Sequence, residues 1–77
     1  MSWNLRIIAF DIEYDSLIYY SVREVYYDDD GNITAVSKQD FPMGSCDLDN
    51  IDLYLNMIKA ALKKPVLKAA DIDHLID

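Results

Sequence analysis

Apolar and polar side chains alternate along the first half of the chain, and this is the period of a β-strand. Residues 3–10 place Trp3, Leu5 and Ile7 on one face and become apolar on both faces toward their end. Residues 17–27 are rich in β-branched and aromatic side chains, which fit the pleated surface of a sheet. Both segments are therefore predicted to be strands.

The two faces of the predicted strand 17–27 have mixed character. Val25 shares one face with Arg23, and Val22 shares the other with Glu24. Because a slip of one residue exchanges the two faces of a strand, two explanations stay open. Either a bulge switches the register midway, or a partner covers the second face.

A tight turn is predicted directly after this strand, at Asp30-Gly31 or Gly31-Asn32. Glycine and asparagine accept the positive φ that short hairpin turns require. The alternation then resumes over residues 33–39, so strands 17–27 and 33–39 are predicted to pair antiparallel. Residues 11–16 carry three acids and a serine and are expected to form the connection between the first two strands.

The apolar spacing changes to three and four residues after Pro42 and Gly44 break the sheet pattern. This spacing predicts an amphipathic helix over residues 48–63. Its expected buried stripe consists of Leu48, Ile51, Leu55, Ile58 and Leu62.

The ends of this helix carry their own signals. Asp47 is the expected N-cap, because its carboxylate can accept from the free backbone N–H groups of the first turn. Aspartates in the first turn and lysines in the last match the helix dipole at both ends. Pro65 ends the helix at or before Lys64.

The predicted architecture is α+β, in one small domain spanning residues 1–77. A three-stranded, mainly antiparallel β-meander is packed by one amphipathic helix in the order β-β-β-α, because one sheet face and one helix stripe make two layers. The tail still carries apolar side chains, so a short C-terminal element is expected near residues 70–76. The other sheet face, or an edge strand, offers a surface for a homodimer.

Composition narrows the function classes. Hydrophobic residues make up 52% of the chain and aromatic residues 12%, too much for a disordered segment. The net charge of −7 argues against direct nucleic-acid binding, which depends on Lys and Arg neutralising phosphates. A protein partner with a basic surface is the natural complement.

Cysteine content and hydropathy bear on location. A single cysteine, Cys46, cannot form an internal disulfide, which fits a reducing compartment. No apolar run approaches the roughly 20 residues of a transmembrane helix, and the first residues do not resemble a signal peptide. The sequence therefore predicts a cytoplasmic protein with no membrane association.

Three groups of residues suggest chemistry, and each has a simpler interpretation. Asp28, Asp29 and Asp30 could bind a metal, but consecutive aspartates lack the alternate spacing of a calcium loop and suit a solvated turn. Asp11, Glu13 and Asp15 share one face of an extended chain and could attract a cation or a basic partner, but a solvated loop is the simpler interpretation. The spacing of Cys46 and the single histidine, His74, permits a dyad, but only the two residue types point to one, and a structural cysteine is the simpler interpretation. We expect no enzyme activity, no cofactor and no metal.

The tyrosines are the unusual compositional feature, since a small two-layer domain can bury only some of them. A tyrosine left outside the core suits a protein interface, because its ring is apolar and its hydroxyl is polar. The residues predicted to bind a partner are Asp11, Glu13, Asp15, Tyr19, Tyr20, Tyr26, Tyr27, Asp28, Asp29 and Asp30.

Three segments together resemble a family of small uncharacterised bacterial and phage proteins. The family pattern is W-N-x-R near the start, E-V-Y-Y-D-E-D-G at the hairpin and A-L-x-K-P-V-L at the helix end. The matching positions here are Trp3, Asn4 and Arg6, then Glu24 to Asp28 with Asp30 and Gly31, then Ala61, Leu62 and Lys64 to Leu67. At the start of the helix, Asp47 and Asn50 depart from the pattern. The resemblance implies origin and fold and transfers no catalytic residue.

The order of hairpin, glycine and acidic amphipathic helix is also similar, in architecture, to HicB-type antitoxins. The expected function is a small acidic protein that acts by protein-protein interaction. One form is a phage-encoded inhibitor of a host defence system that imitates nucleic acid. The alternatives are a HicB-like antitoxin or regulator that neutralises a basic toxin, and a structural homo-oligomeric component.

Overall fold

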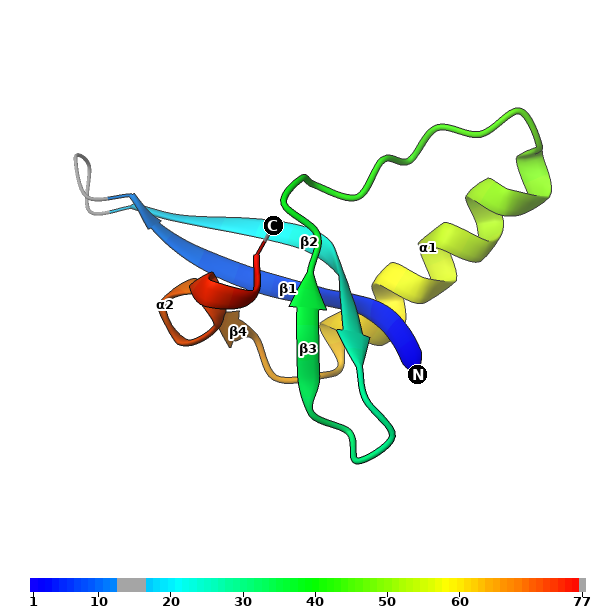
Figure 1. Ribbon diagram of the computed structural model, residues 1–77. Helices are drawn as coiled ribbons and strands as arrows, with labels where there is room; N and C mark the ends of the chain where they lie inside the picture. Colours follow the sequence, from blue (N-terminus) through cyan, green and yellow to red (C-terminus); the bar gives the residue numbers. More distant parts are fainter. Residues whose placement is uncertain (13–16, 77) are drawn as a thin grey trace.

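The computed structural model describes residues 1–12 and 17–76 and has an α+β architecture (Figure 1). A curled mixed sheet carries a long helix on one face and a short C-terminal segment on the other. The elements in chain order are β1 (Ser2–Ile12), β2 (Leu17–Tyr27), β3 (Ile33–Val36), α1 (Leu48–Leu62), β4 (Leu67–Lys68), α2 (Ala69–Ile72) and the 3-10 turn η1 (Asp73–Leu75).

The sheet has four strands in the order β3-β2-β1-β4, so the prediction of three strands was wrong. The predicted antiparallel pairs are present, and β1 and β2 stay in register from Ser2 opposite Tyr27 to Ile12 opposite Leu17. The added strand, β4, is parallel to β1, with Leu67 opposite Ile8. Two residues are too short to show a strand period, so β4 left no signal in the sequence.

The third strand is shorter than its predicted range of 33–39. It ends at Val36, but the chain stays beside β2 for several more residues. The backbone N–H of Ser37 donates to the Glu24 carbonyl at 3.0 Å, and that of Phe41 donates to the Val22 carbonyl at 2.8 Å. The chain therefore protects the edge of β2 without forming a regular ladder.

Both faces of β2 carry apolar and charged side chains, and neither a bulge in mid-strand nor a covering partner is needed to explain this. Its register with β1 is unbroken, and the only irregularity in its pairing with β3 falls between Tyr26 and Tyr27, at the hairpin end. One sheet face packs on α1 through Leu5, Ile7 and Ala61. The opposite face is covered by the chain's own C-terminal segment.

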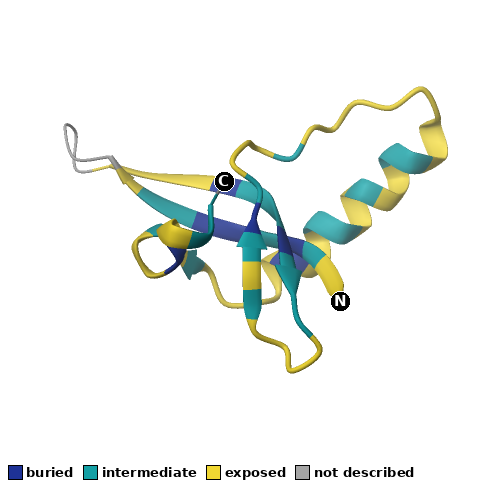
Figure 2. Cartoon of the chain, in the orientation of Figure 1, coloured by how far each residue is buried: buried dark blue, intermediate teal, exposed yellow. Residues whose placement is uncertain are grey.

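This second core consists of Ile8, Val25, Val36 and Ile72. Its closure depends on the path of residues 66–76. The path starts as β4 beside β1 and ends where Ile76 forms a parallel bridge with Val36 of β3. The C-terminal segment thus contacts both edge strands of the curled sheet, β4 and β3. The short C-terminal element predicted from the sequence contributes Ile72 to the core (Figure 2).

Helix α1 begins as predicted but turns a different face to the sheet. The Asp47 carboxylate accepts from the Asp49 backbone N–H at 3.0 Å, which confirms Asp47 as the N-cap. The packed face consists of Met57, Ile58 and Ala61, and Tyr54 meets Phe41 edge to face with ring centres 5.0 Å apart. Three members of the predicted buried stripe, Leu48, Leu55 and Leu62, are exposed.

Residue size explains the difference, because the small side chain of Ala61 lets the helix approach β1 closely where leucine would hold it away. The start of α1 also lies away from the sheet (Figure 1). In the described part of the chain, no helix has the length and apolar character needed to cross a bilayer.

Candidate functional site

The predicted partner-binding residues do not form one surface. Asp11, Tyr19 and Tyr20 lie where β1 ends and β2 begins, and Tyr26 to Asp30 lie at the other end of β2. At about 3.3 Å per residue, the strand separates the nearest members of these two groups, Tyr20 and Tyr26, by roughly 20 Å. Glu13 and Asp15 lie outside the described residues. The two groups are therefore separate patches at opposite ends of β2.

At the turn end, Asp28 is occupied in building the hairpin. Its carboxylate accepts from the backbone N–H groups of Asp30, at 3.0 Å, and Asn32, at 2.9 Å. Gly31 has a φ of 84°, which confirms its predicted role in the turn. Asp29 is exposed and lies 2.9 Å from the N-terminal ammonium group of Met1.

This geometry does not create a metal site at the turn. Within residues 1–12 and 17–76, no three side chains of His, Cys, Asp or Glu lie close enough together to hold a metal ion. Asp29 and Asp30 instead contribute negative charge to an exposed hairpin tip.

Tyr26 and Tyr27 are both half-buried and point to opposite faces. The Tyr27 hydroxyl donates to Asn4 Oδ1 at 2.8 Å and accepts from Arg6 Nη1 at 3.2 Å. Arg6 in turn donates to the Pro65 carbonyl at 2.7 Å. Tyr27 is therefore part of a hydrogen-bond network that connects the sheet to the segment after α1.

Tyr26 has a freer environment, on the sheet face that carries α1. Its ring lies 6.5 Å from that of Trp3, centre to centre, and Trp3 is 47% exposed. Of the two neighbouring tyrosines, Tyr26 is thus the better candidate for a surface contact.

The other end of β2 has the larger uncovered apolar surface. Leu17, Ile18, Tyr19 and Tyr20 are between 43% and 60% exposed. Successive residues of a strand point to opposite faces, so neither face is covered here. We name this part of the hairpin, residues 9–11 and 17–20, the arm; it extends away from the body of the sheet (Figures 1 and 2).

A polar network lies where the arm joins the body. Asp40 accepts from the hydroxyls of Tyr19, at 2.6 Å, and Ser21. Arg23 Nε donates to the Ser21 hydroxyl at 3.0 Å, and the Arg23 guanidinium lies 4.5 Å from the centre of the Phe10 ring. These contacts hold the segment that follows β3 against β2.

Two members of the network, Asp40 and Tyr19, have shifted pKa values. Hydrogen bonds from Ser21 and Tyr19 lower the pKa of Asp40, and the charge of Arg23 adds to this effect. The hydrogen bond to Asp40 raises the pKa of Tyr19. A carboxylate with a lowered pKa is a weaker base, so the arrangement does not favour removal of the Ser21 proton.

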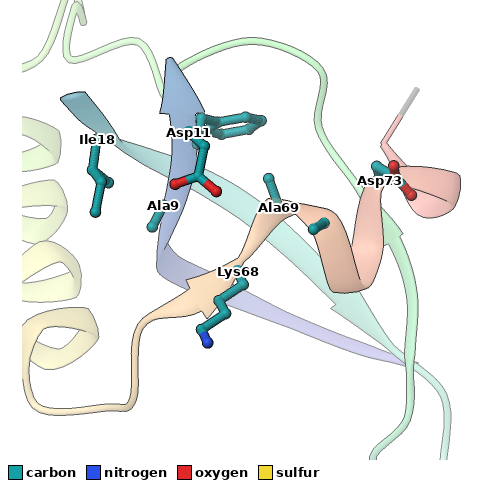
Figure 3. A pocket seen from close by; sticks show the side chains of 8 residues that line it. Ala9, Asp11, Ile18, Lys68, Ala69 and Asp73 are labelled. Atoms are coloured by element: carbon teal, nitrogen blue, oxygen red, sulfur yellow. The ribbon is translucent and has the colours of Figure 1, made fainter. Parts of the chain in front are cut away.

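A pocket of about 650 Å³ lies beside the arm, between the end of β1 and the start of the C-terminal segment (Figure 3). Asp11 and Asp73 contribute acidic groups, Lys68 contributes a basic one, and Phe10 and Ile18 contribute apolar surface. Sequence reasoning found only Asp11 here. Lys68 and Asp73 come close to it because β4 pairs with β1, a long-range contact with no local signal.

Cys46 and His74 do not come together. Cys46 is exposed in the segment before α1, and His74 lies in η1. In Figure 1 the start of α1 and the C-terminal end of the chain lie apart from each other. His74 Nδ1 lies 3.9 Å from the carboxylate of its neighbour Asp73, and both are exposed. The chain thus forms no Cys–His pair.

Comparisons of the chain with protein-family models, with curated proteins and with solved structures found no match.

Proposed function

We propose that this protein is a non-enzymatic binding protein, and that the arm is its contact surface for a protein partner with a basic rim. The observation that supports this proposal most directly is the exposure of four consecutive apolar and aromatic residues, Leu17 to Tyr20, on both faces of one strand. Large exposed apolar patches are uncommon on protein surfaces and often mark interaction sites.

The chemistry of the arm suits a protein interface. Tyrosine offers a large apolar area with few rotatable bonds and keeps a hydroxyl for hydrogen bonding. Tyr19 is already held by its bond to Asp40, so ordering it on binding costs little entropy. Tyr20, at 60% exposure, is the most open of the arm's aromatic side chains.

Charge supports a basic partner. The chain carries fourteen acidic and seven basic residues. Within the described residues, the Asp29 carboxylate forms an ion pair with the N-terminus, and the Asp73 carboxylate lies 3.9 Å from the His74 imidazole, which is charged only when protonated. The other described carboxylates contribute negative electrostatic potential at the surface, and one of them, Asp11, lies on the arm. Such a field speeds the approach of a positively charged surface.

A narrower form of the proposal is an inhibitor, encoded by a phage, that occupies the nucleic-acid site of a host defence protein. The net charge of −7 and the acidic hairpin tip support it. Binding of this kind weakens steeply with salt, because the contacts are electrostatic. An affinity that does not change with salt, or with charge reversal at Asp29 and Asp30, would exclude the inhibitor and leave the broader proposal.

The test compares an arm variant with a matched control. Tyr20→Ser with Ile18→Ser removes apolar surface from the arm, and Leu53→Ser removes surface of similar exposure, 53%, from α1. Proteins retained from a bacterial lysate by the wild-type chain are identified, purified and titrated against each variant by calorimetry.

We expect the arm variant to bind at least about 30-fold more weakly, the loss typical of an aromatic anchor in an interface. The Leu53 variant should bind as the wild type does. Equal affinity of the arm variant and the wild type would overturn the proposal, as would the absence of any partner that binds in the titration.

A further inference from the structure

Helix α1 carries a row of leucines that the chain leaves uncovered. Leu48, Leu55 and Leu62 are 85%, 47% and 68% exposed. They are spaced by seven residues, and an α-helix turns only about 20° short of two full turns over that distance. The three side chains therefore form one nearly straight row along the helix. We name it the leucine row.

The leucine row lies beside the face that packs on the sheet and is separate from it. Tyr54, Met57 and Ala61 mark the packed face. Ile58, at the edge of that face, and Ile51 are half-buried and lie next to the row, one helical turn from the neighbouring leucines. Together the isoleucines and leucines follow the alternating three- and four-residue spacing of helices that pair with another helix.

The flank on the other side of the leucine row is charged. Asp52 and Lys59 both lie there, because they too are seven residues apart. Leu55 lies between them, three residues after the aspartate and four before the lysine. In the described part of the chain neither side chain forms an ion pair, and both are exposed.

These charges are arranged for a second copy of the same helix running in the opposite direction. A two-fold axis through Leu55 places Leu55 against Leu55 and Leu48 against Leu62 of the second copy. The same axis brings Asp52 opposite Lys59 of the second copy, and Lys59 opposite its Asp52.

We infer that α1 forms an antiparallel pair with α1 of a second copy through the leucine row, so that the protein is a homodimer. A parallel pair would bring the charged flank of one helix against the isoleucine flank of the other, so the Asp52–Lys59 contacts between the copies would not form. The opposed helix dipoles add to the preference for the antiparallel pair.

The expected dimer is of modest strength. A helix of fifteen residues is about 22 Å long at 1.5 Å per residue, so the shared face is small. Interfaces at the small end of the range exchange readily between bound and free states. The dimer should therefore dissociate on dilution. This surface is separate from the arm, so the inference stands or falls independently of the proposed function.

The first experiment is sedimentation velocity of the full chain over a wide range of concentrations. Leu55→Glu places two like charges at the two-fold axis, in a position whose exposure in the monomer leaves the fold intact. Leu53→Glu is the matched control, because Leu53 is also exposed on α1 but points away from the leucine row.

We expect a dimer for the wild type and for the Leu53 variant, and a monomer for the Leu55 variant, with circular dichroism unchanged in all three. A wild-type chain that stays monomeric at every concentration would overturn the inference. Equal dimerisation of the Leu55 and Leu53 variants would do so as well.

The second experiment measures orientation by disulfide cross-linking in a Cys46→Ser background. Two cysteines join only when their Cα atoms lie within about 7 Å. Leu55→Cys should link two copies, and so should Leu48→Cys combined with Leu62→Cys. Leu48→Cys alone should not, because its counterpart lies about 21 Å away along an antiparallel pair. Efficient linking of Leu48→Cys alone would show a parallel pair and refute the arrangement.

Discussion

Ile72 tests whether the C-terminal segment is part of the core. It is 8% exposed and packs with Ile8, Val25 and Val36 on the sheet face that α1 does not cover. Ile72→Ala removes three carbon atoms, each worth about 0.8 kcal/mol of transfer free energy. The cavity left behind adds to this loss, so we expect the free energy of unfolding to fall by about 2–4 kcal/mol.

This loss is large for a chain of 77 residues. At about 0.05–0.15 kcal/mol per residue, total stabilities of this size class are roughly 4–12 kcal/mol. The measurement is urea unfolding followed by far-ultraviolet circular dichroism, at one protein concentration for every variant. The dependence of stability on urea should stay the same, because the folded structure still buries nearly the same surface.

Two further variants make the result interpretable. Ile72→Val should cost about 0.5–1.5 kcal/mol, which gives a graded series at one position. Leu53→Ala, at an exposed position of α1, should change stability by less than about 0.5 kcal/mol. If Ile72→Ala behaved like Leu53→Ala, the C-terminal segment would not close the second core, and this account of the fold would be wrong.

Two other predictions concern the polar network and the hairpin. Hydrogen bonds from Ser21 and Tyr19 lower the pKa of Asp40 in the folded state. Ionised Asp40 therefore stabilises the fold above the ordinary pKa of 3.8, and this stabilisation is lost as the pH falls through the folded pKa. Unfolding measured between about pH 5 and pH 2 should therefore lose stability less steeply in Asp40→Asn than in the wild type, and equal slopes would contradict the network. Gly31→Ala should cost about 1–2 kcal/mol in urea unfolding, because Gly31 has a φ of +84° and no atom within 4 Å of an added Cβ, so only the backbone conformation is penalised. Gly31→Asn should cost less, and an alanine variant as stable as the wild type would show that the turn has another conformation.

The parts of the fold with local causes were predictable from the sequence. Strands 3–10 and 17–27 follow from alternation, and the β2–β3 hairpin follows from the turn chemistry of Gly31. The start of α1 follows from Asp47, whose carboxylate makes the expected capping bond. Each of these signals acts over a few residues, so no knowledge of the tertiary structure is needed to interpret it.

The parts that were missed have long-range causes. Leu67 and Lys68 become a strand only because β1 offers a free edge beside them. The sequence predicts a short C-terminal element, but not that it covers the second sheet face with Ile72 in the core and Ile76 bridged to Val36. The candidate site also depends on long-range contacts. Tyr19 and Tyr20 lie on the arm, whereas Tyr27 forms hydrogen bonds with Asn4 and Arg6. Their alternation in the sequence cannot distinguish these environments.

The apolar stripe predicted for α1 and the face that α1 packs on the sheet are different. The three- and four-residue spacing of the predicted stripe correctly indicates an apolar face, but the sheet takes the neighbouring face, where Ala61 permits close approach. Leu48, Leu55 and Leu62 are left in solvent, at a free-energy cost that scales with their apolar area. Pairing with a second copy would bury the same leucines that the spacing marks for burial. The homodimer thus accounts for a pattern that the single chain leaves unexplained, and Leu55→Glu should abolish the pair while it leaves the unfolding of the monomer unchanged.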